Sequence, residues 1–382
     1  NISLEAGDDI IQAADGDITA QDSGKSIDLL AGSDITMNSG AVTTSNDGNI
    51  AYEAQSGDIQ IEEITTGSES NGAGVAITAT LGAIIDLSED LVDITTENLV
   101  LSAGTNIGSG SNHIETSVAT LSTSSGAENG ADNGTYVTES TAAVVDSLTV
   151  SVNRVDSTAS TSTSSVAQED LQSQNNGSIV LIASSGDLTL NDNSDADDQA
   201  LSADGSGNVL LDASANIFIQ GEVDAGSGNI SIVAGGNITQ GAADNTKGDI
   251  LSTAGSIEVD SGGNIAMYDG NSATTSAANV RYYAAGTMDV GAITATNASV
   301  SLSADDITDS AAAGDSSTDV TADKLRIYTT EDASGGAGES DDHLEIAVST
   351  LAADVYTGGL YLTENDDITV DTVSAVGVVR VD

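Results

Sequence analysis

A short phrase recurs along this chain: a pair of turn residues, an alternating apolar run, and a second turn. It reads GNISIVAGGNITQG at 228–241, GSIVLIASSGDLTL at 177–190, GNVLLDASANIFIQG at 207–221 and GNIAYEAQSGDIQI at 48–61. Within a copy the two leading apolar residues lie eight or nine positions apart, and successive copies follow at roughly 20–30 residues. A period in this range indicates a stacked repeat protein.

Each phrase alternates apolar and polar residues over four or five positions, the pattern of a half-buried β-strand. Each phrase also resembles the next one, so like segments would stack on like segments. That arrangement gives parallel strands, whereas an antiparallel meander would need two-residue hairpins between strands of equal length. The sequence therefore predicts an all-β fold, one continuous parallel β-helix (β-solenoid) over residues 1–382, with coils of about 20–25 residues. Asn or Gly at equivalent corners would form stacked ladders.

The composition suits thin, regularly stacked strands. The chain has no Pro, which cannot donate to a hydrogen-bond ladder, and its 41 Gly can form tight corners together with Asn, Asp and Ser. Aromatic residues make up 2% of the chain, so we expect a core of Ile, Leu, Val and Ala.

The charge of the chain limits its partners and its location. With 60 acidic and 7 basic residues the formal net charge is −53, which repels nucleic acid and anionic membrane surfaces. No apolar run approaches the length of a membrane span, so we expect no membrane insertion. Self-repulsion would need screening by salt or divalent cations. An acid-rich, Lys-poor chain predicts an extracellular or cell-surface location in a saline setting.

A longer repeat lies over the short one. LVDITTENLVLSAG (91–104) resembles STDVTADKLRIYTT (317–330), HIETSVATLSTS (113–124) resembles HLEIAVSTLAAD (343–354), GTYVTES (134–140) resembles GLYLTEN (359–365), and SLTV (147–150) resembles DITV (367–370). These matches predict a tandem supermodule of about 226 residues, in which 91–150 corresponds to 317–370. The least patterned stretch, 153–178, is expected to be a loop or lateral insertion.

The phrases GGNITQ and HLEIAVSTLAA…GGLYLTENDDITV resemble the repeat regions of large secreted bacterial exoproteins, such as the filamentous-haemagglutinin-like adhesins. This resemblance of repeat style covers nearly the whole chain. It implies a right-handed parallel β-helix, exported to the cell surface or medium, that serves as a stalk or filament for adhesion. No functional residue is transferred from the family to this chain.

Acidic clusters are the candidate ion sites. Calcium takes six to eight oxygen ligands, which clustered Asp and Asn in a turn can supply. We therefore consider calcium at NDNSDADD (191–198), ESDD (339–342) and ENDD (364–367), although no cofactor is expected to be required. The alternative is a solvated acidic corner that keeps the chain soluble. The candidate ligands are Asp192, Asp195, Asp197, Asp198, Asp341, Asp342, Asp366 and Asp367.

Catalysis is not expected. A carbohydrate-cleaving β-helix needs paired carboxylates beside a cation and sugar-stacking aromatics. Carboxylates occur everywhere in this chain, and Arg281–Tyr282–Tyr283 is the main cationic and aromatic cluster. A larger layer in the core is its expected role, and a sugar-binding patch is the alternative. His113 and His343 occupy equivalent supermodule positions, where each is expected to bond a corner carbonyl.

These patterns predict a structural repeat protein that forms a stiff rod or filament by end-to-end stacking of coils. The chain starts within one strand phrase and ends just after another, which suggests a processed subunit or a span of something longer. Its main partner would be itself. The alternative function is an adhesin shaft that binds a surface glycan through lateral loops. The stacking ends are predicted at Ile2, Leu4, Val376, Val378, Val379 and Val381.

Overall fold

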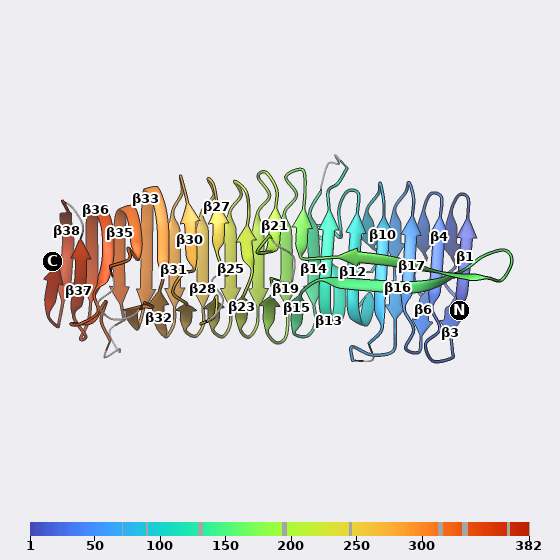
Figure 1. Cartoon of the computed structure of the whole chain (residues 1–382), viewed down its shortest axis with the longest axis horizontal. Coiled ribbons are helices and arrows are strands. Elements are labelled where there is room, and N and C mark those ends of the chain that lie inside the picture. Colours follow the sequence, from blue (N-terminus) through green and yellow to red (C-terminus); the bar gives the residue numbers. More distant parts are fainter. Residues whose placement is uncertain are drawn as a thin grey trace. The chain divides into compact units, whose positions relative to one another are not determined.

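The computed structural model describes residues 1–70, 72–88, 91–128, 133–192, 197–243, 247–311, 316–330, 335–364 and 367–381. These residues form β-strands and turns, without a helix among them. They group into two compact units. Unit 1 comprises Asn1–Asn193 and Ala200–Gly207, and unit 2 comprises Ser194–Gln199 and Asn208–Asp382. Figure 1 labels the strands of both units.

In unit 1 the chain winds into coils whose strands form three ladders. The first ladder begins with β1 (Ile2–Ala6), β4 (Ile27–Ala31), β7 (Ile50–Ala54) and β10 (Gly74–Ala79). The second ladder consists of β2 (Ile10–Gln12), β5 (Ile35–Met37), β8 (Ile59–Ile61) and β11 (Ile84–Asp86). The third ladder begins with β3 (Ile18–Ala20), β6 (Val42–Ser45) and β9 (Glu63–Thr65). Two long strands, β12 (Ile94–Ala103) and β13 (Ile114–Ser125), then run through the corner from the third ladder into the first. Unit 1 also contains β14 (Thr135–Glu139), β15 (Ala143–Val145), β18 (Leu171–Ser173), β19 (Ile179–Ala183), β20 (Leu188–Leu190) and most of β21 (Gln199–Ala203).

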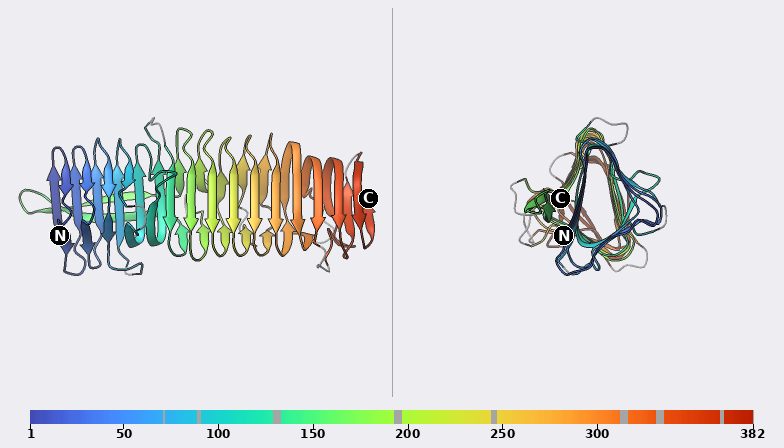
Figure 2. Two further views of the ribbon diagram at one scale, coloured as in Figure 1. Left: turned by 180° about the vertical axis from the view of Figure 1, so that it is seen from behind. Right: turned by 90° about the vertical axis from the view of Figure 1, so that its right-hand side faces the viewer.

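Unit 2 repeats this plan with different strand lengths. Its first ladder begins with β22 (Val209–Ala213), β25 (Ile230–Ala234), β28 (Ile257–Ser261) and β31 (Val280–Ala284). Its second ladder begins with β23 (Ile217–Ile219), β26 (Ile238–Gln240), β29 (Ile265–Met267), β32 (Thr287–Val290) and β34 (Asp306–Asp309). Its third ladder begins with β24 (Glu222–Asp224), β27 (Ile250–Ser252) and β30 (Ser272–Thr275). The remaining strands are β33 (Ala292–Ala304), β35 (Val320–Thr329), β36 (Leu344–Val355), β37 (Leu360–Glu364), β38 (Thr369–Ala375) and β39 (Val379–Val381). Seen end-on in Figure 2, the coils have three sides.

The strands of the ladders are parallel and stack like on like, as the phrases predicted. Ile2 pairs with Ile27, Ile27 with Ile50, and Ile50 with Val75. Ile27, Ile50 and Val75 are fully buried and form one inward column of the core. The all-β parallel solenoid is therefore confirmed, and its core is aliphatic because each inward position stacks on the same position of the next coil.

Side-chain ladders at the corners hold successive coils in register. In unit 2, Oδ1 of Asn216 accepts the backbone N–H of Asn237 (2.8 Å), and Oδ1 of Asn237 accepts that of Asn264 (2.8 Å). Asp takes this role in unit 1, where Asp34 accepts the N–H of Asp58 (2.8 Å) and Asp58 accepts that of Ala83 (2.8 Å). The Asn ladders that the sequence predicted are present, and some of the acidic residues also have this structural role.

An antiparallel hairpin leaves the coils of unit 1 and packs against their outside. It consists of β16 (Leu148–Val155) and β17 (Thr161–Gln168), and β16 contacts β1, β4, β7, β10, β12 and β13. In Figure 1 it runs across these strands, and its turn reaches past β1. This hairpin overlaps the stretch 153–178 that the sequence analysis expected to be a loop or lateral insertion, and the chain is back in a coil at β18.

The register also refines the supermodule. Thr369 and Val370 pair with Thr350 and Leu351, just as Val144 and Val145 pair with Thr120 and Leu121. The structural counterpart of 369–370 is therefore 144–145. The sequence comparison had matched 367–370 to 147–150, but that stretch starts the hairpin instead.

The supermodule also extends to earlier coils, which share a buried Tyr–Gln contact. Tyr52 and Tyr282 both point into the core, and their hydroxyls bond Oε1 of Gln12 (3.4 Å) and Oε1 of Gln240 (3.0 Å). Tyr282 thus occupies the core layer that the sequence suggested.

Candidate functional site

The acidic residues predicted as calcium ligands do not converge in the described part of the chain. Asp198 is exposed and pairs with Lys247 (2.6 Å). Asp342 forms a tight turn with Glu339, in which each backbone N–H bonds the other residue's carbonyl. Among the other candidates, Asp192 is half-buried, Asp197, Asp341 and Asp367 are exposed, and Asp195 and Asp366 lie outside the described residues.

Four of the six residues predicted as stacking ends lie in β1 and β39. Ile2 and Leu4 belong to β1 and are in register with the buried Ile27 and Leu29. Val379 and Val381 belong to β39 and are in register with the buried Leu360 and Leu362. Val376 and Val378 occupy the turn before β39, where they are 68% and 58% exposed.

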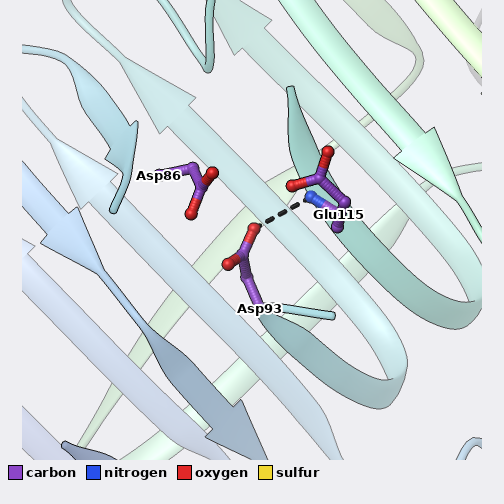
Figure 3. A group of neighbouring side chains, drawn as sticks. All are labelled: Asp86, Asp93 and Glu115. Atoms are coloured by element: carbon purple, nitrogen blue, oxygen red, sulfur yellow. Dashed lines mark hydrogen bonds between the residues drawn. The ribbon is translucent and has the colours of Figure 1, made fainter. Parts of the chain in front are cut away.

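A cluster of three acidic side chains that the sequence analysis did not single out lies inside unit 1. Asp86 ends β11, Asp93 directly precedes β12, and Glu115 lies in β13. One carboxylate oxygen from each lies within 4.8 Å of the others. The exposed fraction is 0% for Asp93 and 5% for Asp86. Figure 3 shows the three carboxylates turned toward a common point. We call this group triad 1.

The backbone holds one oxygen of each aspartate in triad 1. The N–H of Ser88 donates to Oδ1 of Asp86 (2.7 Å), and the N–H of Glu115 donates to Oδ2 of Asp93 (2.9 Å). The second oxygens, Oδ2 of Asp86 and Oδ1 of Asp93, are buried and accept no hydrogen bond. The two aspartates are thus fixed in orientation while each retains an oxygen that can bind another group.

The electrostatics of triad 1 oppose full ionisation. Burial and the neighbouring carboxyl groups of Asp86 and Glu115 raise the pKa of Asp93 to about 10, against the lowering effect of the Glu115 N–H. Three ionised carboxylates at this separation therefore need a neutralising partner, which is either a proton or a cation.

Unit 2 contains the same arrangement at the corresponding supermodule positions. Asp309 ends β34, Asp319 precedes β35 and Glu345 lies in β36, again with one oxygen each within 4.8 Å of the others. The backbone contacts match those of triad 1: the N–H of Ala311 donates to Oδ1 of Asp309 (2.9 Å), and that of Glu345 donates to Oδ2 of Asp319 (2.7 Å). Asp309 and Asp319 are buried. We call this group triad 2.

A signal for these triads was present in the sequence. In the aligned stretches 91–104 and 317–330 the identical residues are Asp93/Asp319, Thr95/Thr321 and Leu99/Leu325. Glu115 and Glu345 follow the two histidines at the same spacing. Because these acidic residues are identical between the two stretches while most of their neighbours differ, the sequence comparison could have identified Asp93 and Glu115, or Asp319 and Glu345, as two members of each triad. Asp86 and Asp309 lie outside the matched phrases, so only the fold brings them in.

The histidines that precede the glutamates have equivalent structural roles. Nδ1 of His113 bonds Oγ1 of Thr138 (2.8 Å), and Nδ1 of His343 bonds Oγ1 of Thr363 (3.0 Å). The rings face Tyr136 and Tyr361, with centroid distances of 5.9 and 6.0 Å. The expected corner carbonyl was wrong, since Nδ1 of each ring bonds a threonine hydroxyl on the next coil instead. Burial lowers the pKa of His113.

Models of protein families, curated proteins and solved structures gave no match to this chain. In the part of the chain that the structure describes, no helix has the length and apolar character needed to cross a membrane.

Proposed function

We propose that this chain is part of an extracellular structural repeat protein that forms a stiff rod or filament by stacking coil on coil. The β-solenoid scaffold supports this proposal, since stacked coils can be added at either end without a new fold. The likeness of its phrases to the repeats of filamentous-haemagglutinin-like exoproteins supports the same role and an exported location. The net charge of −53 would keep such an assembly soluble in a saline medium.

The exposed inward columns of the outermost coils carry the proposal. Leu4 is 41% exposed although its register partner Leu29 is fully buried. Val379 is 48% exposed although its partner Leu360 is fully buried. Both positions have the side-chain direction of core residues, so a further coil can continue the inward columns at β1 and at β39. A further coil of the same kind, stacked on each, would bury apolar area worth roughly 25 cal/mol per Å² and pair the open strand edge.

The hairpin also lies beside β1. The N–H of Val155 donates to Oγ of Ser3 (2.8 Å), and the turn that follows reaches past β1 in Figure 1. A coil stacked on β1 would therefore contact this turn as well as the coil itself.

The test is the association of the 382-residue chain in solution. Sedimentation velocity over increasing concentration, in salt sufficient to screen the charge, should show end-to-end oligomers. Val379→Asp places a charge on the inward column and should abolish them, whereas Ser374→Asp adds the same charge at an outward position of β38 and should not. A wild-type chain that stays monomeric at every concentration, or equal association of the two variants, would contradict the proposal.

A further inference from the structure

The two triads are the strongest unexplained feature of the molecule, and they lie away from the stacking ends. We propose that each triad is a binding site for one divalent cation, specifically Ca²⁺, with Asp86, Asp93 and Glu115 as ligands in unit 1 and Asp309, Asp319 and Glu345 as ligands in unit 2. This inference does not depend on the proposed filament role.

The first argument is the buried oxygens of triad 1. Oδ1 of Asp93 and Oδ2 of Asp86 are buried and accept no hydrogen bond. Figure 3 shows the carboxylates of these two residues turned toward each other and toward Glu115. A buried carboxylate oxygen without a partner is costly, because it has lost its hydration and gained nothing in return. A cation between these oxygens would remove that cost and the mutual repulsion of the carboxylates.

The second argument is the match of the ligand set to calcium. All three groups are carboxylates, the hard oxygen ligands that Ca²⁺ prefers. Oxygens on opposite sides of a Ca²⁺ ion are separated by up to about 4.8 Å, since each Ca–O distance is about 2.4 Å. The three oxygens of each triad lie within this limit. Mg²⁺ suits the site less well, because it usually keeps most of its waters and uses one or two carboxylates.

The same arrangement of three acidic residues recurs in both units, which is a third observation in favour of a bound ion. The units differ at most positions in the aligned stretches, yet both keep three acidic residues, and in both the same two backbone N–H groups orient the aspartates. Solubility would not require buried acids, and a packed corner would be more stable with apolar residues. A shared ligand explains why a costly arrangement occurs twice.

The position of each site indicates what the ion would do. Asp93 lies opposite Glu115 on adjacent coils, because the next residues, Ile94 and Thr116, are register partners. In unit 2, β35 and β36 carry the corresponding residues, with Val320 paired to Ile346. A bound cation would therefore link two successive coils through side chains, in addition to their backbone hydrogen bonds.

The experiment counts the Ca²⁺ ions bound to the whole chain by equilibrium dialysis at micromolar free Ca²⁺ and physiological ionic strength. The wild type should bind two ions, Asp93→Asn and Asp319→Asn one each, and the double variant none. Asn keeps the oxygen that accepts the backbone N–H, so these variants should still fold, which circular dichroism checks. The Glu115→Gln variant should likewise lose the Ca²⁺ ion bound in unit 1.

The matched control instead removes two acids outside the triads, the exposed Asp341 and the half-buried Asp342. The double variant Asp341→Asn/Asp342→Asn should keep two ions, and its melting temperature should still rise on Ca²⁺ addition, whereas the Asp93/Asp319 double variant should lose that rise. Equal numbers of bound ions in the wild type and the triad double variant would overturn the proposal. A wild type that binds no ion at these concentrations would also overturn it, and would leave shared protons as the explanation of the triads.

Discussion

At the scale of single residues, side-chain carbonyl and carboxylate oxygens at the corners bond the backbone of the next coil. A corner N–H would otherwise depend on water, since the ladder ends there. Asn237 is a central member of such a series. Its side-chain oxygen accepts the backbone N–H of Asn264, and its own backbone N–H donates to the side-chain oxygen of Asn216. Asn and Asp at these corners thus stabilise the register as well as the turn.

Asn237→Ala should lower the free energy of unfolding by about 1 kcal/mol, the usual net value of one hydrogen bond. Asn237→Asp keeps the accepting oxygen and should cost less. Urea denaturation of both variants measures the difference. Equal stability of the Ala variant and the wild type would show that water replaces this bond fully.

Glu222 in β24 gives a pH-dependent contribution at the same scale. Burial and the charges of Asp224, Asp249 and Asp198 raise its pKa to about 7, while a hydrogen bond from Gln199 acts in the opposite direction. The folded state then holds a proton that the unfolded chain releases near pH 4.3. Between about pH 4.3 and 7 the native state binds more protons, so this contribution to stability falls as the pH rises.

The Glu222→Gln variant separates this effect from the general charge of the chain. The stability of the wild type relative to the variant should be constant below about pH 4, decrease through pH 5 and 6, and level off above about pH 8. Urea denaturation at each pH measures the relative stability. A relative stability that does not change with pH, or that increases with it, would contradict the assigned pKa.

At the scale of elements, the hairpin is the feature that departs from the repeat. Outward positions of the first ladder are mostly half-buried, with a few exposed, but Asp28, Ala76 and Val100 are buried where β16 crosses them. Val150 packs against Ala76 and Val100, with Leu148 and Val166 beside them. A small apolar cluster and the ion pairs of Arg154 with Asp28 and Glu53 therefore help to attach the hairpin to the coils.

Arg154→Ala should detach the end of the hairpin. Nε and Nη2 of Arg154 donate to Oδ2 and Oδ1 of Asp28 (2.8 and 3.0 Å), and Nη2 also reaches Oε2 of Glu53 (3.1 Å). Asp28 is 1% exposed, so the variant leaves a buried charge without its partner. We expect a loss of about 2 kcal/mol and faster hydrogen exchange across 148–168, measured by mass spectrometry.

The double variant Asp28→Ala/Arg154→Ala serves as the control, since it removes both charges and should recover part of the loss. Unchanged exchange in the Arg154→Ala hairpin would mean that the apolar cluster alone holds it.

The sequence predicted the repeating elements well and this insertion less well. The phrases determine strand length, corner residues and inward faces directly, because each coil satisfies the same pattern. The alternation in LTVSVNRV (148–155) is also a strand pattern, but nothing local indicates that its partner is the outside of earlier coils. The triads were missed for the same reason, since Glu115 reaches Asp86 and Asp93 only through coil stacking. Glycan binding by lateral segments stays a prediction.

At the scale of the whole molecule, parallel stacking of the coils in register within each unit is the feature on which the others depend. The corner ladders and the triads between adjacent coils both follow from that one arrangement. The net charge of −53 acts against it, so screening by salt or bound cations should be a general condition of stability.

Disulfide formation between introduced cysteines tests the stacking most directly, because the natural chain has no Cys. Phe218, Thr239 and Ala266 are outward register partners on three successive coils of unit 2. Adjacent coils are about 4.8 Å apart, within the range of a disulfide, and coils two apart are about 10 Å apart, beyond it. On mild oxidation, peptide mass spectrometry should find the bond in Phe218→Cys/Thr239→Cys and not in Phe218→Cys/Ala266→Cys. A missing bond in the first pair, or equal yields in both, would contradict the parallel solenoid.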